Sequence, residues 1–345
     1  MADIYPTTKI AAVQAAPVFL DRDETIKKVR RLTKEAKNNG ADLVVFPESF
    51  IPTFPVWCQI LNPMDQHAFF TRLYQNAVMI PSPAFNELQK IARDNSIFLS
   101  IGVTEKGENS MGAMWNTNLI FDRSGNLIAR HRKLQPTWAE KLIWSFGDGS
   151  SLNVHDTEIG RLGCLICGEN TNTIARYAIA AQMEQIHIST YPPCSPTNRF
   201  SKGDYPNTLR VRACAHSFEA KVFTVASCSV LDQQALEEIT AVDSTLVNWL
   251  EDQSWATTMI AAPNGQICSD IIGDNQEGIV YAECDINREI ALKNLHDVTG
   301  SYQRFDIFQL NVDKTVREPI FVSKQNDLPD RDFYPFVEDT PEINE

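Results

Sequence analysis

The chain has 345 residues, of which 43% are hydrophobic and 22% are charged, values that are ordinary for a globular protein. Its formal net charge of −13 argues against nucleic acid and against an anionic membrane surface as partners, because both require a basic face. No apolar stretch approaches the roughly 18 residues of a membrane span, and the first residues lack the pattern of a secretory signal, so we expect a cytoplasmic protein.

Eight cysteines are spread along the whole chain, which is far too sparse for a disulfide scaffold. We therefore expect reduced thiols, most of them buried as small hydrophobic side chains. A structural zinc site usually needs a second pair of ligands at short spacing. Apart from Cys164 and Cys167 the cysteines stand alone, and no two histidines have an HxxxH-type spacing. The sequence therefore predicts no metal site.

Strand and helix patterns alternate along the chain. A buried strand is predicted at 9–17, an amphipathic helix at 23–40 with Gly40 as its C-cap, and a short apolar strand at 41–48. The later predictions, in chain order, are a helix near 83–95, a strand at 97–103, a hairpin over 116–133 that turns at 122–125, a strand at 161–167, a helix at 173–185, a strand at 186–190, a helix over roughly 205–220, a strand at 221–227, and strands at 256–263 and 278–285 joined through an Asn264-Gly265 turn.

Apolar strands between amphipathic helices indicate sheets that are covered by helices, and the hairpins indicate that these sheets are mixed. Because no repeat or low-complexity linker divides the chain, we expect one domain over residues 1–300. From about residue 300 the pattern weakens, and the end of the chain is acidic and contains prolines. Residues 301–345 are therefore expected to form a tail, partly extended, that either wraps a neighbouring subunit or is disordered.

Three predicted strands end in a chemically reactive side chain: Glu48 after LVVFP, Lys133 after LIARHR, and Cys167 after RLGCLI. Active sites gather at the carboxyl ends of strands, where side chains are exposed on a rigid support. A carboxylate can take the proton of a thiol, and a cation can stabilise the thiolate and a later anion. Each residue alone has a common alternative, since strand-end Glu and Lys are usually solvated and most cysteines are core residues.

The pair Cys164 and Cys167 could also be a redox CxxC motif. Side chains alternate between the faces of a strand, so two residues at this odd spacing point to opposite faces. A redox CxxC normally begins a helix, whose dipole lowers the pKa of the thiol. Cys164 instead lies within the apolar run and Cys167 at its end. We therefore interpret them as one packed and one exposed thiol.

Three motifs together resemble the nitrilase branch of the carbon–nitrogen hydrolase superfamily. They are VVFPESFIPTFPVW around Glu48, ARHRKLQPTWAEKLIWSFGDGS around Lys133, and GRLGCLICGENTNTIARYAIAAQMEQIHIST around Cys167. The likeness extends from KIAAVQAAPVFLD to VTGSYQRFDIFQL, or about 300 residues. It implies a four-layer αββα sandwich, two mixed sheets covered by helices. Nitrilases usually carry Trp directly after the nucleophile, where this chain has Gly168, which leaves its substrate specificity open.

The resemblance implies a catalytic set of Glu48, Lys133 and Cys167, with Glu140 as a supporting carboxylate that holds Lys133. Glu48 would activate Cys167 for attack on a nitrile carbon, and Lys133 with the backbone N–H of Gly168 would stabilise the developing charge. No cofactor is needed. The product would be a carboxylic acid, with ammonia released.

The walls of the substrate pocket are expected to be partly aromatic. Phe54, Trp57, Trp138 and Tyr191 lie near the catalytic strand ends in sequence, although each could equally be a core residue. His131 and His187 could suggest a Cys–His dyad, but both lie inside predicted strands, so we expect them to pack or to bond to backbone.

The resemblance thus implies a nitrilase that takes a small-molecule nitrile and forms a homo-oligomer, either a dimer through its helical layers or a larger assembly such as a spiral, and we expect the protein to be cytoplasmic. Three alternatives stay open. An amidase or carbamoylase would use the same three residues, a cyanide- or nitrile-hydrating enzyme would stop at the amide, and a redox or scaffold protein would hydrolyse nothing.

Overall fold

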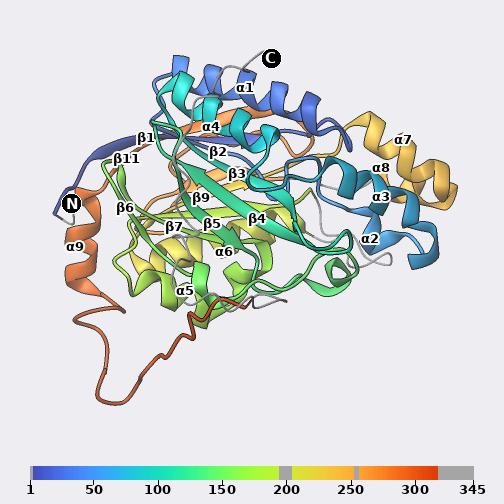
Figure 1. Ribbon diagram of the computed structural model, residues 1–345. Coiled ribbons are helices and arrows are strands. Elements are labelled where there is room, and N and C mark those ends of the chain that lie inside the picture. The colour runs from blue at the N-terminus through green and yellow to red at the C-terminus, as the bar shows by residue number, and fades with distance from the viewer. Residues whose placement is uncertain (1–2, 194–203, 252–255, 318–345) are drawn as a thin grey trace, which may run out of the picture.

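The computed structural model describes residues 3–193, 204–251 and 256–317, and the strands in these ranges form two sheets (Figure 1). One sheet has six strands in the order β11-β1-β2-β3-β4-β5, and the other has five in the order β10-β9-β8-β7-β6. The first contains β1 (Thr7–Gln14), β2 (Leu43–Val45), β3 (Phe98–Lys106), β4 (Met114–Phe121), β5 (Leu127–Arg132) and β11 (Gly278–Asp285). The second contains β6 (His155–Thr157), β7 (Gly160–Ile166), β8 (Ile186–Tyr191), β9 (Phe223–Cys228) and β10 (Met259–Ala261).

Helices cover the outer faces of both sheets. Figure 1 shows α1 and α4 on one side of the molecule and α5 and α6 on the other, with the strands between them. The helices are α1 (Arg22–Asn38), α2 (Trp57–Ile60), α3 (His67–Asn76), α4 (Pro83–Asn95), α5 (Thr173–Ala180), α6 (Tyr205–Ala220), α7 (Gln233–Val242), α8 (Val247–Glu251) and α9 (Asn287–Leu295). The predicted four-layer αββα sandwich is therefore confirmed.

The core is divided between these layers. A cluster of apolar residues from both sheets, such as Ile10 and Leu162, fills the space between them. A second cluster lies between the six-stranded sheet and helices α1 and α4. Helix α1 has the local features that such packing needs: Asp21 caps its N-terminus by accepting a hydrogen bond from the Glu24 N–H at 3.0 Å, and Gly40 continues past its end with a φ of +81°.

Both sheets are mixed, as predicted. In the six-stranded sheet β1, β2 and β3 pair in parallel, whereas β3, β4 and β5 form an antiparallel meander. The turn between β4 and β5 lies where the sequence placed it. Asp122 accepts hydrogen bonds from the Ser124 and Asn126 N–H groups at 2.8 Å, and Gly125 has a φ of +85°, a conformation that favours glycine.

The predicted pairing of the last two strands is wrong. A turn does form at Asn264-Gly265, where Gly265 donates to the Ala262 carbonyl at 2.8 Å. However, β10 pairs with β9 in one sheet, and β11 pairs with β1 in the other. After the turn the chain returns only as far as an isolated bridge between Ala261 and Ile267 before it crosses to the other sheet. A turn signal specifies a local reversal, but it does not specify which sheet takes the next strand.

Several elements are shorter than predicted, and the strand expected at 256–263 is limited to β10 (Met259–Ala261). The strand expected at 41–48 is limited to β2 (Leu43–Val45), because the chain then turns and Ser49 adopts a φ of +43°. The helix expected at 173–185 ends at Ala180, and Met183 has a φ of +62° in the turn that leads into β8. Among the described helices, none has the length and apolar character needed to cross a membrane.

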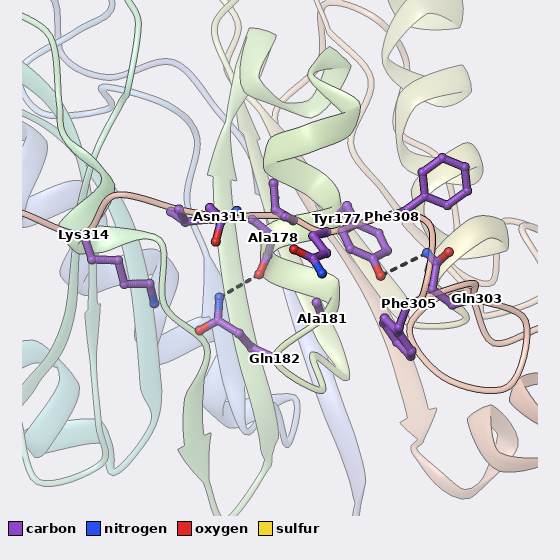
Figure 2. A pocket seen from close by; sticks show the side chains of 12 residues that line it. Tyr177, Ala178, Ala181, Gln182, Gln303, Phe305, Phe308, Asn311 and Lys314 are labelled. Atoms are coloured by element: carbon purple, nitrogen blue, oxygen red, sulfur yellow. Dashed lines mark hydrogen bonds between the residues drawn. The ribbon is translucent and has the colours of Figure 1, made fainter.

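Residues 301–317 contain no helix or strand and run back along the chain's own surface. Gln303 donates a hydrogen bond to the Tyr177 hydroxyl on α5 at 3.0 Å, and Lys314 donates to Asn153 at 2.7 Å. Figure 2 shows this segment passing over α5. Side chains of the segment and of α5 line a cavity of about 760 Å³. The rest of the predicted tail, 318–345, lies outside the described residues.

Candidate active site

The three reactive side chains follow strand ends, as predicted: Glu48 comes after β2, Lys133 after β5 and Cys167 after β7. Glu48 and Lys133 come from the six-stranded sheet and Cys167 from the five-stranded sheet. Lys133 Nζ lies 2.7 Å from Glu48 Oε1 and 2.7 Å from Glu140 Oε2, and it is completely buried. The structure therefore joins Glu48, Lys133 and Glu140 in one buried ionic group. The surface alternatives for Glu48 and Lys133 are excluded.

Glu48 has the environment of a proton acceptor. Its Oε1 accepts a hydrogen bond from Asn116 at 2.6 Å as well as from Lys133, whereas Oε2 has no hydrogen-bond partner among the described residues. Burial raises the pKa of the Glu48 carboxyl to about 7, with Lys133 opposing and the Glu140 charge adding to this rise. A carboxyl with a pKa near neutrality can both take up and return a proton under ordinary conditions.

Lys133 stays charged in this site. Burial by itself would lower the pKa of its ammonium group, but the carboxylates of Glu140 and Glu48 raise it well above the usual value. Glu140 is itself held in the 3₁₀ turn Trp138–Leu142, where its Oε2 accepts a hydrogen bond from the Thr137 N–H at 2.9 Å. The cation is therefore fixed between two carboxylates and can act as a permanent positive charge.

Cys167 begins the 3₁₀ turn Cys167–Thr171 directly after β7 and has a φ of +49°. A positive φ is strained for a residue other than glycine and is often found at functional sites. Two other residues show the same strain: Ser49 (φ +43°), which follows Glu48, and Trp138 (φ +47°), which lies in the same 3₁₀ turn as Glu140. Burial raises the pKa of the Cys167 thiol, and the Glu48 charge adds to this, so the free thiol is protonated and needs a base.

The close packing behind Glu48 depends on one glycine. A Cβ on Gly102 of β3 would lie 2.4 Å from the Pro47 carbonyl oxygen and 2.4 Å from the Ser49 nitrogen. No side chain fits there, so the turn that carries Glu48 can rest directly on β3 only because residue 102 is a glycine.

Cys167 opens onto a cavity of about 300 Å³, a size suited to a small molecule. The cavity is lined by Gln59, Thr137, Trp138, Glu140, Cys167, Gly168, Pro192, Asp204, Tyr205, Thr208 and Arg212. We expected an exposed thiol, but Cys167 is only 8% exposed. This expectation is corrected, because the strand end lies at the base of a partly open cavity and not at the surface of the molecule.

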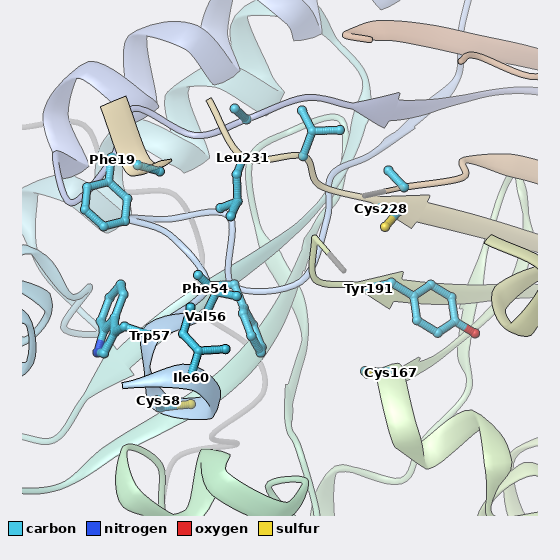
Figure 3. Packing of buried hydrophobic residues seen from close by; sticks show 14 of the residues in the cluster. Phe19, Phe54, Val56, Trp57, Cys58, Ile60, Cys167, Tyr191, Cys228 and Leu231 are labelled. Atoms are coloured by element: carbon cyan, nitrogen blue, oxygen red, sulfur yellow. The ribbon is translucent and has the colours of Figure 1, made fainter. Parts of the chain in front are cut away.

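The expected aromatic wall is only partly present. Trp138 and Gly168 line the cavity, but Phe54, Trp57 and Tyr191 do not. Those three are at most 1% exposed and pack inside a hydrophobic cluster, where Figure 3 shows Phe54 and Trp57 gathered with Phe19. Trp57 stacks on Phe69 with ring centroids 5.0 Å apart. These aromatic rings form the core beneath the site rather than its wall.

Several polar residues of the site were missed by the sequence interpretation, and Asn116 and Arg212 are the two that bear most directly on the reactive groups. Asn116 binds Glu48, and its carbonyl accepts the Lys133 N–H at 2.8 Å. The hairpin turn at 122–125 places these two residues opposite one another, so its register could have identified Asn116. Arg212 lines the cavity from helix α6, and its positive charge acts to lower the pKa of the Cys167 thiol. No motif in the sequence around Arg212 marks it.

The two histidines lie within strands, as expected, but they bind side chains rather than backbone. His131 contacts Ser151 and Glu169, at 3.0 and 2.9 Å. His187 Nδ1 lies 2.6 Å from Glu184 Oε1, and His216 Nε2 lies 3.0 Å from Glu184 Oε2. Glu184, His187 and His216 are close enough to hold a metal ion, with ligand atoms within 4.8 Å. In this geometry, however, the distances are those of hydrogen bonds between the carboxylate and the two rings.

Cys164 and Cys167 occupy different environments. Cys164 packs in the cluster between the two sheets, whereas Cys167 belongs to the cluster beneath the cavity. Both are free thiols, and burial raises the pKa of the Cys164 thiol well above its ordinary value. A buried, protonated thiol within a sheet core has the character of a packing residue.

Comparisons with known proteins agree with these observations. The family model described as carbon-nitrogen hydrolase matches residues 9–294. A nitrilase of Bacillus sp. (strain OxB-1) is 36% identical, covering 92% of this chain and 91% of its own length. An aliphatic nitrilase of Rhodococcus rhodochrous is 31% identical, and the match covers 93% of this chain and 86% of the length of that nitrilase. The solved structure of an amidase mutant from Nesterenkonia AN1, described as a member of the nitrilase superfamily, superposes with a TM-score of 0.60 at 17% identity, covering 85% of this chain and 96% of its own. The chain therefore belongs to the carbon–nitrogen hydrolase family, in its nitrilase branch.

Proposed function

We propose that the protein hydrolyses an organic nitrile to the carboxylic acid and ammonia through a covalent intermediate on Cys167. The observation that carries this proposal is the buried group in which Lys133 lies 2.7 Å from both Glu48 and Glu140, beside the cavity that Cys167 and Glu140 line. Identities of 36% and 31% to two nitrilases support a nitrile rather than the amide taken by a structural neighbour at 17% identity.

In the proposed reaction Glu48 accepts the thiol proton of Cys167 as the sulfur bonds to the nitrile carbon. The nitrile nitrogen takes that proton, which gives a thioimidate. A water activated by Glu48 then adds to the same carbon, the C–N bond breaks, and ammonia leaves, so that a thioester remains. A second water breaks the C–S bond and releases the acid with the free thiol.

Lys133 is proposed to stabilise the negative charge that develops at the substrate, together with the Gly168 N–H. Its charge is permanent, because two carboxylates keep its pKa high. Glu140 is proposed to hold Lys133 in place rather than to touch the substrate's reacting atoms, since its Oε2 is already bonded to Lys133 and to the Thr137 N–H. This mechanism requires no cofactor.

The test of this function compares a nitrile with its matched amide. Purified enzyme should release ammonia and acid from phenylacetonitrile or an aliphatic nitrile much faster than from the corresponding amide, with little amide accumulating. Product analysis by chromatography distinguishes the alternatives. Amide as the main product would indicate a hydrating enzyme, turnover of the amide alone would indicate an amidase, and a reversible Cys164–Cys167 disulfide without hydrolysis would indicate a redox protein.

We further propose that the protein is a cytoplasmic homo-oligomer, a dimer or larger. Apolar side chains on α5, α6 and residues 301–317 are exposed by more than half, among them Ile174, Phe218, Tyr302 and Phe308. Because single-chain proteins rarely expose apolar side chains in groups, this face fits contact with a second copy of the chain. Light scattering at micromolar concentration should give a mass well above that of one chain, 38.8 kDa. A mass equal to that of one chain would contradict the proposal.

A further inference from the structure

A second buried carboxylate, Glu169, lies two residues after Cys167 and takes no part in the proposed reaction. Its Oε1 accepts a hydrogen bond from the Leu134 N–H at 2.6 Å, and its Oε2 accepts one from the Ile166 N–H at 2.7 Å. The His131 ring lies 2.9 Å from the same Oε2. Glu169 is 6% exposed, so these contacts form away from water.

The positions of these partners connect the two halves of the site. Leu134 directly follows Lys133, and Ile166 directly precedes Cys167. Lys133 follows β5 of the six-stranded sheet, whereas Cys167 follows β7 of the five-stranded sheet. Within the described residues no strand of one sheet pairs with a strand of the other. The Glu169 carboxylate therefore bonds to the backbone beside the cation and to the backbone beside the thiol.

We propose that Glu169 is a positioning residue that sets the separation between Lys133 and Cys167 by joining the two sheets at their catalytic strand ends. This inference rests on the proposed function, in which those two groups act on the same substrate atoms. Apolar packing between sheets is non-directional, whereas two short hydrogen bonds to one rigid carboxylate fix both distance and angle. Catalytic groups need support of this kind, since a misplacement of about 1 Å can cost about 10²-fold in rate.

The charge of Glu169 is important for this role. Burial by itself would raise the pKa of its carboxyl, but His131 and the two backbone N–H donors hold it below the ordinary value. Hydrogen bonds to an ionised acceptor are shorter and roughly twice as strong as those between neutral groups. A glutamine has the same size, but its amide group would point at least one N–H toward a donor.

The experiment is therefore Glu169→Gln, with Glu105→Gln as a matched control. Glu105 is also a buried carboxylate, and it accepts hydrogen bonds from Arg130 at 3.2 Å and Arg132 at 3.0 Å. All of its partners lie on the six-stranded sheet, so its removal costs stability without releasing one sheet from the other. We expect E169Q to lose about 10²-fold in kcat with KM changed only a few-fold, whereas E105Q should keep kcat within a few-fold.

A second measurement is independent of the substrate. Alkylation of Cys167 by iodoacetamide, located by peptide mass mapping, should be at least about 10-fold slower in E169Q than in E105Q. The reason is that formation of the Cys167 thiolate depends on where Glu48 and Lys133 lie relative to the sulfur. If E169Q does not fold, Glu169→Asp is the alternative variant. It keeps the charge but cannot reach both backbones, so its kcat should also fall, by less than in E169Q. Equal kcat losses in E169Q and E105Q, or a wild-type kcat in E169D, would overturn the inference. Failure of wild-type enzyme to act on any nitrile would instead refute the proposed function.

Discussion

Cys167→Ala is expected to abolish nitrile turnover and to leave the fold intact, whereas Cys164→Ala should keep activity and lose stability. The Cys167 sulfur is the atom to which the substrate bonds in the proposed reaction, and the residue lines the cavity. Cys164 packs between the sheets, so its removal should lower the free energy of unfolding by about 1 kcal/mol, the cost of a small buried group. Ammonia release and denaturant unfolding measure the two effects.

A covalent adduct provides an independent check on the same pair. When wild-type enzyme is quenched with acid during turnover, substrate carbon should be found on sulfur, and peptide mass mapping should place the added mass on Cys167 alone. An adduct on Cys164, or two single variants that are equally inactive, would show that the two thiols have been assigned to the wrong roles.

Glu48→Gln should fold normally and lose at least about 10²-fold in kcat, the lower range for removal of a general base. Glutamine keeps the volume and can still accept from Asn116 and Lys133, but it cannot take the thiol proton. Because burial raises the pKa of Glu48 to about 7, the wild-type kcat/KM should rise as the pH increases through neutrality and the carboxyl loses its proton. That rise should be absent in the variant.

The control for this prediction is Glu87→Gln, which removes a partly exposed carboxylate on α4 that pairs with Arg30 and Lys90. Its kcat and pH profile should match those of the wild type. Wild-type turnover in Glu48→Gln would mean that another group accepts the proton, and the role assigned to Glu48 would then have to be abandoned.

Much of the fold could be predicted because its signals are local. The apolar periodicity of α1 and α4, the glycine after α1 and the turn at 122–125 depend on residues close in sequence, and each lies where it was expected. The strand ends that carry Glu48, Lys133 and Cys167 were also predictable, because each apolar run stops at a reactive side chain. The resemblance of the three surrounding motifs to the nitrilase branch added Glu140.

The sequence by itself therefore indicated most of the strands, the mixed sheets covered by helices, and the strand-end side chains Glu48, Lys133 and Cys167, but not helices α3, α7 and α9. Only the tertiary structure decided that β10 and β11 belong to different sheets, that Trp57 and Tyr191 lie in the core rather than on the cavity wall, and that Glu169 joins the two catalytic strand ends. The physical reason is that propensity and periodicity act over a few neighbouring residues. The partner that a buried ring or carboxylate finds depends on how two sheets pack, and the residues that meet there are far apart in sequence.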